Sequence, residues 1–128
     1  MVEGRRVLMV DDDPVILRLL AVNFRLEGFE VMSATRGEEA LALAAASPPD
    51  AVLLDIMMPG MDGSEVCRRL RALPGLEDIP VVFLSARIRE DDDEPADPAL
   101  GPVTYVPKPF DPQDLVGLVL RRIGGTAA

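Results

Sequence analysis

The sequence predicts an α/β fold, a doubly wound, five-stranded parallel sheet with helices on both faces. Two observations support this prediction. Short apolar runs alternate along the 128 residues with segments whose apolar residues recur at helical spacing. The connections have ordinary lengths for the helical crossovers that parallel strands need. We expect one domain over residues 1–128, with its core in 5–123 and a frayed tail at 124–128.

Five segments are predicted to be strands. Most are short, apolar and rich in β-branched residues, which suits strands buried on both faces of a sheet. The second segment instead alternates apolar and polar residues, as an edge strand does. The expected strands are RVLMV (6–10), FEVMSA (29–34), AVLLD (51–55), IPVVFLS (79–85) and VTYVPKPF (103–110).

Four helices are predicted between and after these strands. In the first, Ile16, Leu20 and Phe24 recur on one face, with Leu19 beside them. Proline or glycine follows the periodic part of most of these segments and ends it. The expected helices lie within residues 14–28, 37–50, 64–73 and 111–123.

Two of these helices begin with an aspartate directly before a proline. Asp13 precedes Pro14, and Asp111 precedes Pro112. An N-cap aspartate followed by proline at the first helical position is a favoured helix start. We therefore expect Asp13 to cap the first helix, although it adjoins two other aspartates.

A further helix is expected between the strands at 79–85 and 103–110, but its sequence opposes a regular one. The segment REDDDEPADPALG (89–101) contains Pro95 and Pro98, and a proline inside a helix costs about 3 kcal/mol. Its aspartates also repel one another. We expect an irregular or shortened fourth helix within residues 88–101.

The composition excludes several classes of function. The net charge of -9, without a basic stripe, argues against nucleic-acid or anionic-membrane surfaces. The absence of histidine, with a single cysteine (Cys67), excludes histidine acid–base chemistry, histidine-ligated zinc and thiolate clusters. Cys67 is expected to be a packing residue. No segment has the length of a membrane span or the pattern of a signal peptide, so we expect a cytoplasmic protein.

Chemically active side chains stand at the ends of the predicted strands. Asp11 and Asp12 follow the first strand, Asp55 ends the third, Ser85 ends the fourth, and Lys108 follows the fifth. The carboxyl ends of parallel strands share one edge of a sheet, so these residues are expected to converge. Three close carboxylates need a cation, and Mg²⁺ suits oxygen ligands. One carboxylate could then attack phosphorus and become an acyl phosphate.

Four segments at these strand ends, in this order, resemble the receiver domain of two-component response regulators. They are VLMVDDDP, AVLLDIMMPGMDG, VVFLSA and YVPKPF. The resemblance covers residues 5–123 and implies a flavodoxin-like (βα)5 fold with strand order 2-1-3-4-5. It also implies a phosphorelay function. A sensor histidine kinase or phosphotransfer protein would donate the phosphoryl group, and a downstream protein target would receive the signal.

The resemblance assigns roles to the residues of the acidic site. Asp55 would be the phosphoacceptor, Asp12 the direct metal ligand, and Asp11 the carboxylate that holds metal-bound waters. The backbone carbonyl of Met57 would be the third protein ligand of Mg²⁺, and Lys108 would pair with the phosphoryl group. The domain would catalyse its own phosphotransfer and acyl-phosphate hydrolysis without being a conventional enzyme.

The resemblance also assigns a switch. Ser85 would be the switch hydroxyl and Tyr105 the aromatic residue that swings inward, and the Lys108–Pro109 bond is typically cis in this family. Met57 and Arg87 occupy positions that influence dephosphorylation in this family. A bulky Met57 could shield the phosphoryl group from water.

Other readings remain open for parts of this pattern. Strand-end aspartates can simply cap helices, Ser85 can satisfy backbone groups, and Tyr105 can be a static, half-buried residue. The irregular segment 88–101 leaves room for a phosphorylation-independent interaction module. A phosphatase of the haloacid dehalogenase type fits less well, since it uses an Asp-x-Asp pair and a larger fold. Both a stand-alone regulator and an excised receiver fit the chain.

Overall fold

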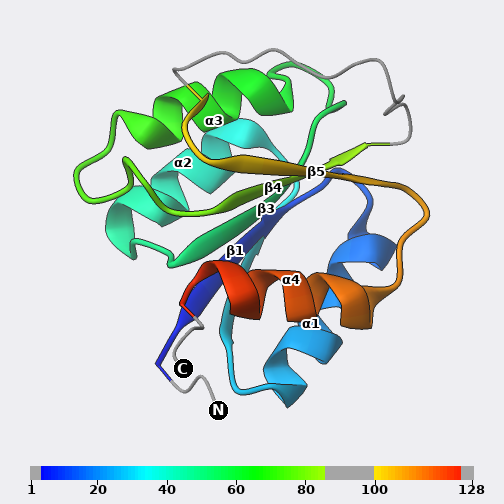
Figure 1. The fold of residues 1–128 in the computed structure, drawn as a ribbon. Helices are drawn as coiled ribbons and strands as arrows, with labels where there is room; N and C mark the ends of the chain where they lie inside the picture. The colour runs from blue at the N-terminus through cyan, green and yellow to red at the C-terminus, as the bar shows by residue number, and fades with distance from the viewer. Residues whose placement is uncertain (1–3, 86–99, 125–128) are drawn as a thin grey trace.

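A parallel sheet between two layers of helices forms the molecule (Figure 1). The computed structural model describes residues 4–85 and 100–124. Its strand order, β2-β1-β3-β4-β5, is the order that the resemblance implied, so the predicted doubly wound fold is confirmed. The strands are β1 (Arg6–Val10), β2 (Glu30–Ala34), β3 (Ala51–Asp55), β4 (Val81–Ser85) and β5 (Val103–Pro107). The helices are α1 (Pro14–Leu26), α2 (Gly37–Ala46), α3 (Gly63–Arg71) and α4 (Pro112–Arg122).

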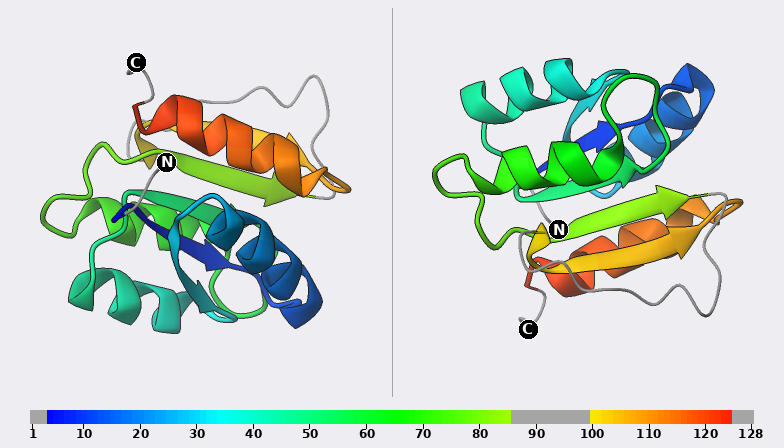
Figure 2. Two further views of the ribbon diagram at one scale, coloured as in Figure 1. Left: turned by 90° about the horizontal axis from the view of Figure 1, so that it is seen from below. Right: turned by 90° about the horizontal axis from the view of Figure 1, so that it is seen from above.

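The helices cover the sheet in pairs. Helices α1 and α4 pack on one face, and α2 and α3 pack on the other (Figures 1 and 2). Successive side chains of a strand point to opposite faces, so β1 supplies both cores. Leu8 and Val10 face α2 and α3, whereas Val7 and Met9 face α1 and α4. All four are at most 1% exposed, as expected for a central strand buried on both faces.

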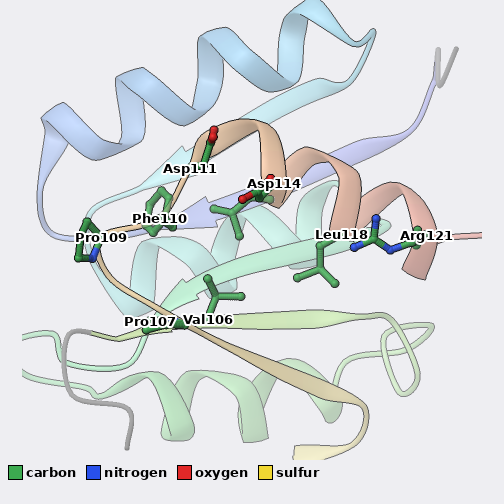
Figure 3. Close-up of a pocket in the computed structure, with 9 residues that line it drawn as sticks. Val106, Pro107, Pro109, Phe110, Asp111, Asp114, Leu118 and Arg121 are labelled. Atoms are coloured by element: carbon green, nitrogen blue, oxygen red, sulfur yellow. The ribbon is translucent and has the colours of Figure 1, made fainter.

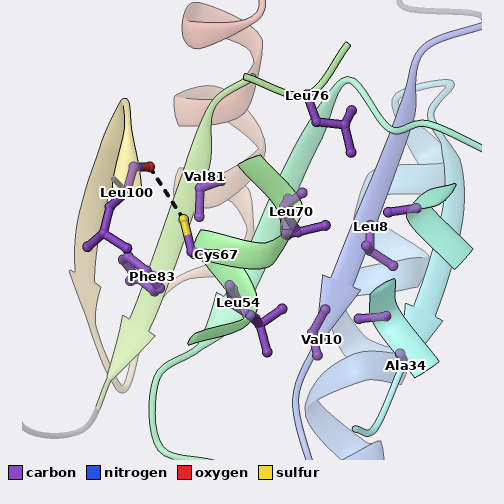
Figure 4. Close-up of a cluster of buried hydrophobic side chains, with 14 of the residues drawn as sticks. Leu8, Val10, Ala34, Leu54, Cys67, Leu70, Leu76, Val81, Phe83 and Leu100 are labelled. Atoms are coloured by element: carbon purple, nitrogen blue, oxygen red, sulfur yellow. Dashed lines mark hydrogen bonds between the residues drawn. The ribbon is translucent and has the colours of Figure 1, made fainter. Parts of the chain in front are cut away.

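The core beside α3 shows how the third helix is held (Figure 4). Its buried residues Cys67 and Leu70 pack among Leu54, Val81 and other apolar side chains of the sheet. Cys67 is fully buried, which confirms its packing role. Burying such side chains stabilises the fold by about 1.5–3 kcal/mol each.

The predicted strands and helices agree closely with the structure. The alternating segment is the edge strand β2, as expected. The expectation for Leu19 was wrong, because its side chain is 48% exposed while Leu17, Leu20 and Phe24 are buried. Each residue turns a helix by about 100°, which carries Leu19 away from the buried stripe. The expected irregular fourth helix, within residues 88–101, lies almost wholly outside the described residues.

The predicted aspartate caps are confirmed. The side chain of Asp13 accepts a hydrogen bond from Val15 N at 2.9 Å, and that of Asp111 accepts one from Gln113 N at 2.9 Å. Among the described helices, none has both the length and the apolar character needed to cross a membrane.

Candidate functional site

The carboxyl ends of β1 and β3 bring three carboxylates together. The two strands pair in parallel, with Val10 opposite Leu54, so Asp11 follows one strand beside the point where Asp55 ends the other. Asp11, Asp12 and Asp55 each offer a carboxylate oxygen, and these oxygens lie within 4.8 Å of one another. Asp11 and Asp55 are buried and Asp12 is exposed. The predicted convergence of the three aspartates is therefore present.

Lys108 brings a positive charge to the same cluster from the far edge of the sheet. Its Nζ lies 3.0 Å from Asp11 Oδ2 and 3.7 Å from Asp55 Oδ1. Its backbone N–H donates to Ser85 O at 2.8 Å, which fixes the lysine beside the end of β4. The Lys108–Pro109 peptide bond is cis, as the resemblance implied. One ammonium offsets only part of the charge of three carboxylates.

Backbone N–H groups hold the two buried carboxylates in place. Asp11 Oδ1 accepts a hydrogen bond from Asp13 N at 2.9 Å, and Asp55 Oδ1 accepts one from Met57 N at 3.2 Å. Asp13 thus serves the site through its backbone while its side chain caps α1. These hydrogen bonds orient the two carboxylates without neutralising their negative charges.

The turn after Asp55 depends on a close approach at Gly63. A Cβ at this position would lie 2.6 Å from Asp55 O and 2.8 Å from Ile56 Cα, closer than real Cβ contacts. Gly63 N also donates to Ile56 O at 2.8 Å. The start of α3 therefore packs directly on the end of β3, and any larger residue would push Asp55 or the helix out of place.

The environment of Asp55 raises the pKa of its carboxyl group. Burial raises its pKa from the ordinary 3.8 to about 6, and the charge of Asp11 adds to this effect. The Lys108 ammonium and the Met57 N–H act in the opposite direction, and Asp12 raises the pKa further. A group with a raised pKa beside two carboxylates is one whose ionised form a bound cation would stabilise.

The donor set of this cluster suits a divalent metal ion. All three side chains offer carboxylate oxygens, which hard cations prefer. Asp12 is exposed and Asp11 is buried, so the cluster has both a side open to solvent and an ordered interior. The acidic cluster is thus a candidate site for a divalent cation.

The remaining predicted residues lie around this cluster. Ser85 is buried at the end of β4, and the Met57 side chain is 53% exposed. Tyr105 is 43% exposed, and its ring stacks on Phe83 with centroids 5.2 Å apart. The aromatic ring therefore lies on the surface of β5. Arg87 lies outside the described residues.

A pocket between β5 and α4 is separate from the acidic cluster. Pro109, Phe110, Asp114 and Leu118 are among its lining residues (Figure 3). Neither Lys108 nor any of the three clustered aspartates lines it. The chemistry of the site therefore belongs to the strand ends and not to this pocket.

Sequence reasoning missed two supports of the site. Asp62 caps α3, with its side chain accepting from Glu65 N at 3.0 Å, and the spacing Asp62-x-x-Glu65 is the signal that could have shown it. The second support is Gly63, where the structure has no room for a side chain. No local pattern reveals that requirement, because it comes from the end of another element.

Comparisons with known proteins point to one family. A family model described as the response regulator receiver domain matches residues 7–120. The transcriptional regulatory protein PrrA of Mycobacterium tuberculosis is 46% identical over 129 residues, which cover 98% of this chain and 54% of the relative. The chain thus spans about half the length of the curated relatives it matches.

Solved structures agree with this match. The receiver domain of the sensor histidine kinase PA1611 from Pseudomonas aeruginosa, solved with a magnesium ion in its active site cleft, has a TM-score of 0.82 and 30% identity. The match covers 95% of this chain and 99% of that one. Chemotaxis protein CheY4 of Vibrio cholerae has a TM-score of 0.82 and 27% identity, covering 92% and 98%. The chain belongs to the response regulator receiver domain family, the receivers of two-component systems.

Proposed function

We propose that Asp55 is the phosphoacceptor of this receiver domain. The observation that supports this role is its position, a buried carboxylate with Asp11 and Asp12 within 4.8 Å and the Lys108 ammonium 3.7 Å away. The donor would be the phosphohistidine of a sensor histidine kinase or of a phosphotransfer protein. An Asp55 oxygen attacks phosphorus, an O–P bond forms, the histidine N–P bond breaks, and an acyl phosphate results.

The metal in this proposal is Mg²⁺. Asp11, Asp12, Asp55 and the Met57 backbone carbonyl would hold it, Asp12 directly and Asp11 through waters. The magnesium ion in the cleft of the PA1611 receiver supports the choice. Mg²⁺ would supply positive charge that offsets the carboxylates and the charge developing on the phosphoryl oxygens. Lys108 supplies the second positive charge, and the backbone bonds of Asp11 and Asp55 keep their oxygens oriented.

Two further residues would convert phosphorylation into a change of surface. Ser85 ends β4 beside Lys108, and Tyr105 lies on β5. In the proposed switch the Ser85 hydroxyl moves toward the phosphoryl group, and Tyr105 leaves its exposed position over Phe83. The surface near β5 and α4 then differs between the two states. Water would later hydrolyse the acyl phosphate and restore the Asp55 carboxylate.

The output of this domain is proposed to be a protein contact and not a nucleic-acid contact. The relatives are named as transcriptional regulators and are about twice as long, so the partner surface would belong to a further domain or to a separate protein. Residues 1–128 are proposed to form one receiver domain, with its core in residues 5–123. The alternative of a phosphorylation-independent module depended on residues 88–101, which lie mostly outside the described residues.

Phosphorylation by a small phosphodonor tests the proposal directly. The protein is incubated with acetyl phosphate and Mg²⁺, and intact-protein mass spectrometry counts the phosphoryl groups gained. We expect one group on the wild type and none on Asp55→Asn or after removal of Mg²⁺ with a chelator. Asp111→Asn is the matched control, because asparagine also caps helices and this residue lies outside the cluster. Full labelling of Asp55→Asn would refute the assignment.

A further inference from the structure

The last residue of α3 binds backbone carbonyls of two other segments. Within the described residues, the Arg71 guanidinium donates to Leu76 O at 3.1 Å and Ile79 O at 2.6 Å, both in the connection to β4. It also donates to Leu100 O at 2.8 Å and Pro102 O at 2.9 Å, just before β5. Hydrogen bonds from a charged, planar guanidinium are stronger than neutral ones and direction-specific. Arg71 therefore joins the entries of β4 and β5.

The segment that Arg71 holds is also anchored in the core. Leu100 is 7% exposed and belongs to the cluster beside α3 (Figure 4). Its carbonyl accepts a second bond, from Cys67 Sγ at 3.4 Å, one helical turn before Arg71. Two side chains of α3 thus bind one carbonyl at the start of β5.

Gly101 leaves the space that this contact occupies. A Cβ at Gly101 would lie 2.7 Å from Arg71 Nε, and the residue has a φ of +67°, a conformation that favours glycine. The chain between the two carbonyl acceptors therefore fits around the guanidinium. The contact therefore needs both the Arg71 side chain and the absence of a side chain at Gly101.

The edge position of β5 makes such a contact consequential. Within the described residues β5 pairs with β4 alone, in a register that sets Phe83 opposite Tyr105 and Ser85 opposite Pro107. A slip by one residue would turn every side chain of the strand to the other face. It would also move Lys108 by about 3.3 Å along the sheet, which is as large as its distance from Asp11.

We propose that Arg71 is a positioning residue that fixes the register of β5 against β4, and so places Tyr105 and Lys108. Arg71 and Val81 N share the Pro102 carbonyl at the start of the strand, and Lys108 N bonds Ser85 O at its end. An effect of Arg71 on phosphoryl transfer rests on the proposed role of Lys108. Its effect on the register of β5 is independent of that role.

The chain contains its own probe for this proposal. Tyr105 is the only tyrosine and tryptophan is absent, so the intrinsic fluorescence reports on β5 alone. The variant is Arg71→Met, which removes the donors at similar length. Arg69→Met, on the exposed side of the same helix, controls for the loss of an arginine, and Val66→Ala in the core controls for a general loss of stability.

For Arg71→Met we expect a changed acrylamide quenching of Tyr105. Amide exchange in β5 should be about tenfold faster or more, while β1 and β3 keep their rates relative to each other. Val66→Ala should accelerate exchange without this selectivity, and Arg69→Met should behave as the wild type. Gly101→Ala places a methyl group against the Arg71 guanidinium and should reproduce the selective change in β5. This variant replaces Arg71→Met in the test if Arg71→Met does not fold.

Phosphorylation by acetyl phosphate separates the two proposals. A selective change in β5 with about tenfold slower phosphorylation supports both the register and the role of Lys108. The same change with an unaltered rate supports the register and contradicts the role of Lys108. Wild-type quenching and exchange in β5 of the folded Arg71→Met and Gly101→Ala variants would overturn the positioning role of Arg71.

Discussion

The Lys108 ammonium lies 3.0 Å from Asp11 Oδ2 and 3.7 Å from Asp55 Oδ1, so it is bound more closely to Asp11 than to the proposed phosphoacceptor. This contact ties the end of β5 to the end of β1, across the ends of β3 and β4. Asp11 therefore both contributes to the acidic cluster and binds the ammonium that is proposed to pair with a phosphoryl group on Asp55. A phosphoryl group on Asp55 would compete with Asp11 for the same ammonium.

Replacing Lys108 by methionine should slow phosphorylation by acetyl phosphate about a hundredfold, because one preorganised positive charge is lost from the transition state. Lys108→Arg keeps the charge with a different shape and should retain more activity. Time courses of intact mass at saturating Mg²⁺ provide the rates. Equal rates for Lys108→Met and the wild type would contradict the assignment.

The raised pKa of Asp55 gives the stability a defined dependence on pH. Its pKa is about 6 in the folded protein against an ordinary 3.8, so between these values the folded state binds more protons than the unfolded chain. The free energy of unfolding therefore falls as pH rises through this window. Above it the Asp55 charge destabilises the folded state by up to about 3 kcal/mol.

Asp55→Asn removes that charge and should stabilise the protein near pH 7 by about 1–3 kcal/mol in the absence of Mg²⁺. The gain should shrink as the pH falls from about 6 toward about 4, where the wild-type carboxyl is already protonated. Urea unfolding at several pH values measures it. Asp111→Asn is the control. A gain that is constant over this range would contradict the shifted pKa.

Substitutions of the adjacent aspartates Asp12 and Asp13 should have different effects on stability and on Mg²⁺ binding. Asp13→Ala loses the bond to Val15 N and should lower the free energy of unfolding by about 1 kcal/mol, with unchanged Mg²⁺ affinity. Asp12→Ala should weaken Mg²⁺ binding at least about tenfold and leave the stability without metal unchanged or higher. Lys108 is the only lysine, so the NMR signal of its Nζ can be assigned without ambiguity and followed as Mg²⁺ is added. Similar effects of both substitutions would show that the three aspartates act as one group.

The residues at the carboxyl ends of the strands were predictable for a physical reason. Each of Asp11, Asp55, Ser85 and Lys108 follows or ends an apolar run, and parallel strands present such positions at one edge. The caps at Asp13 and Asp111 were predictable because they depend on neighbours in the sequence. Local patterning therefore predicted the fold class and the membership of the acidic cluster, and the resemblance added the strand order.

What the sequence did not reveal depends on contacts between distant elements. The space at Gly63 is set by the end of β3, and the partners of Arg71 lie up to 31 residues away. The preference of Lys108 for Asp11 over Asp55 joins residues 97 positions apart.

The lifetime of the phosphorylated state should depend on Met57. Its backbone N–H donates to Asp55 Oδ1 and the residue is 53% exposed, and we expect its side chain to shield an acyl phosphate on Asp55 from water. Met57→Ala keeps the backbone bond and removes the shield, so loss of the phosphoryl group should accelerate about threefold or more, a barrier lower by at least about 0.6 kcal/mol. Intact mass after removal of the phosphodonor measures the decay. Leu26→Ala, which removes an exposed apolar side chain from α1, should decay as the wild type does. An unchanged lifetime in Met57→Ala would show that water reaches the acyl phosphate by a path that this side chain does not cover.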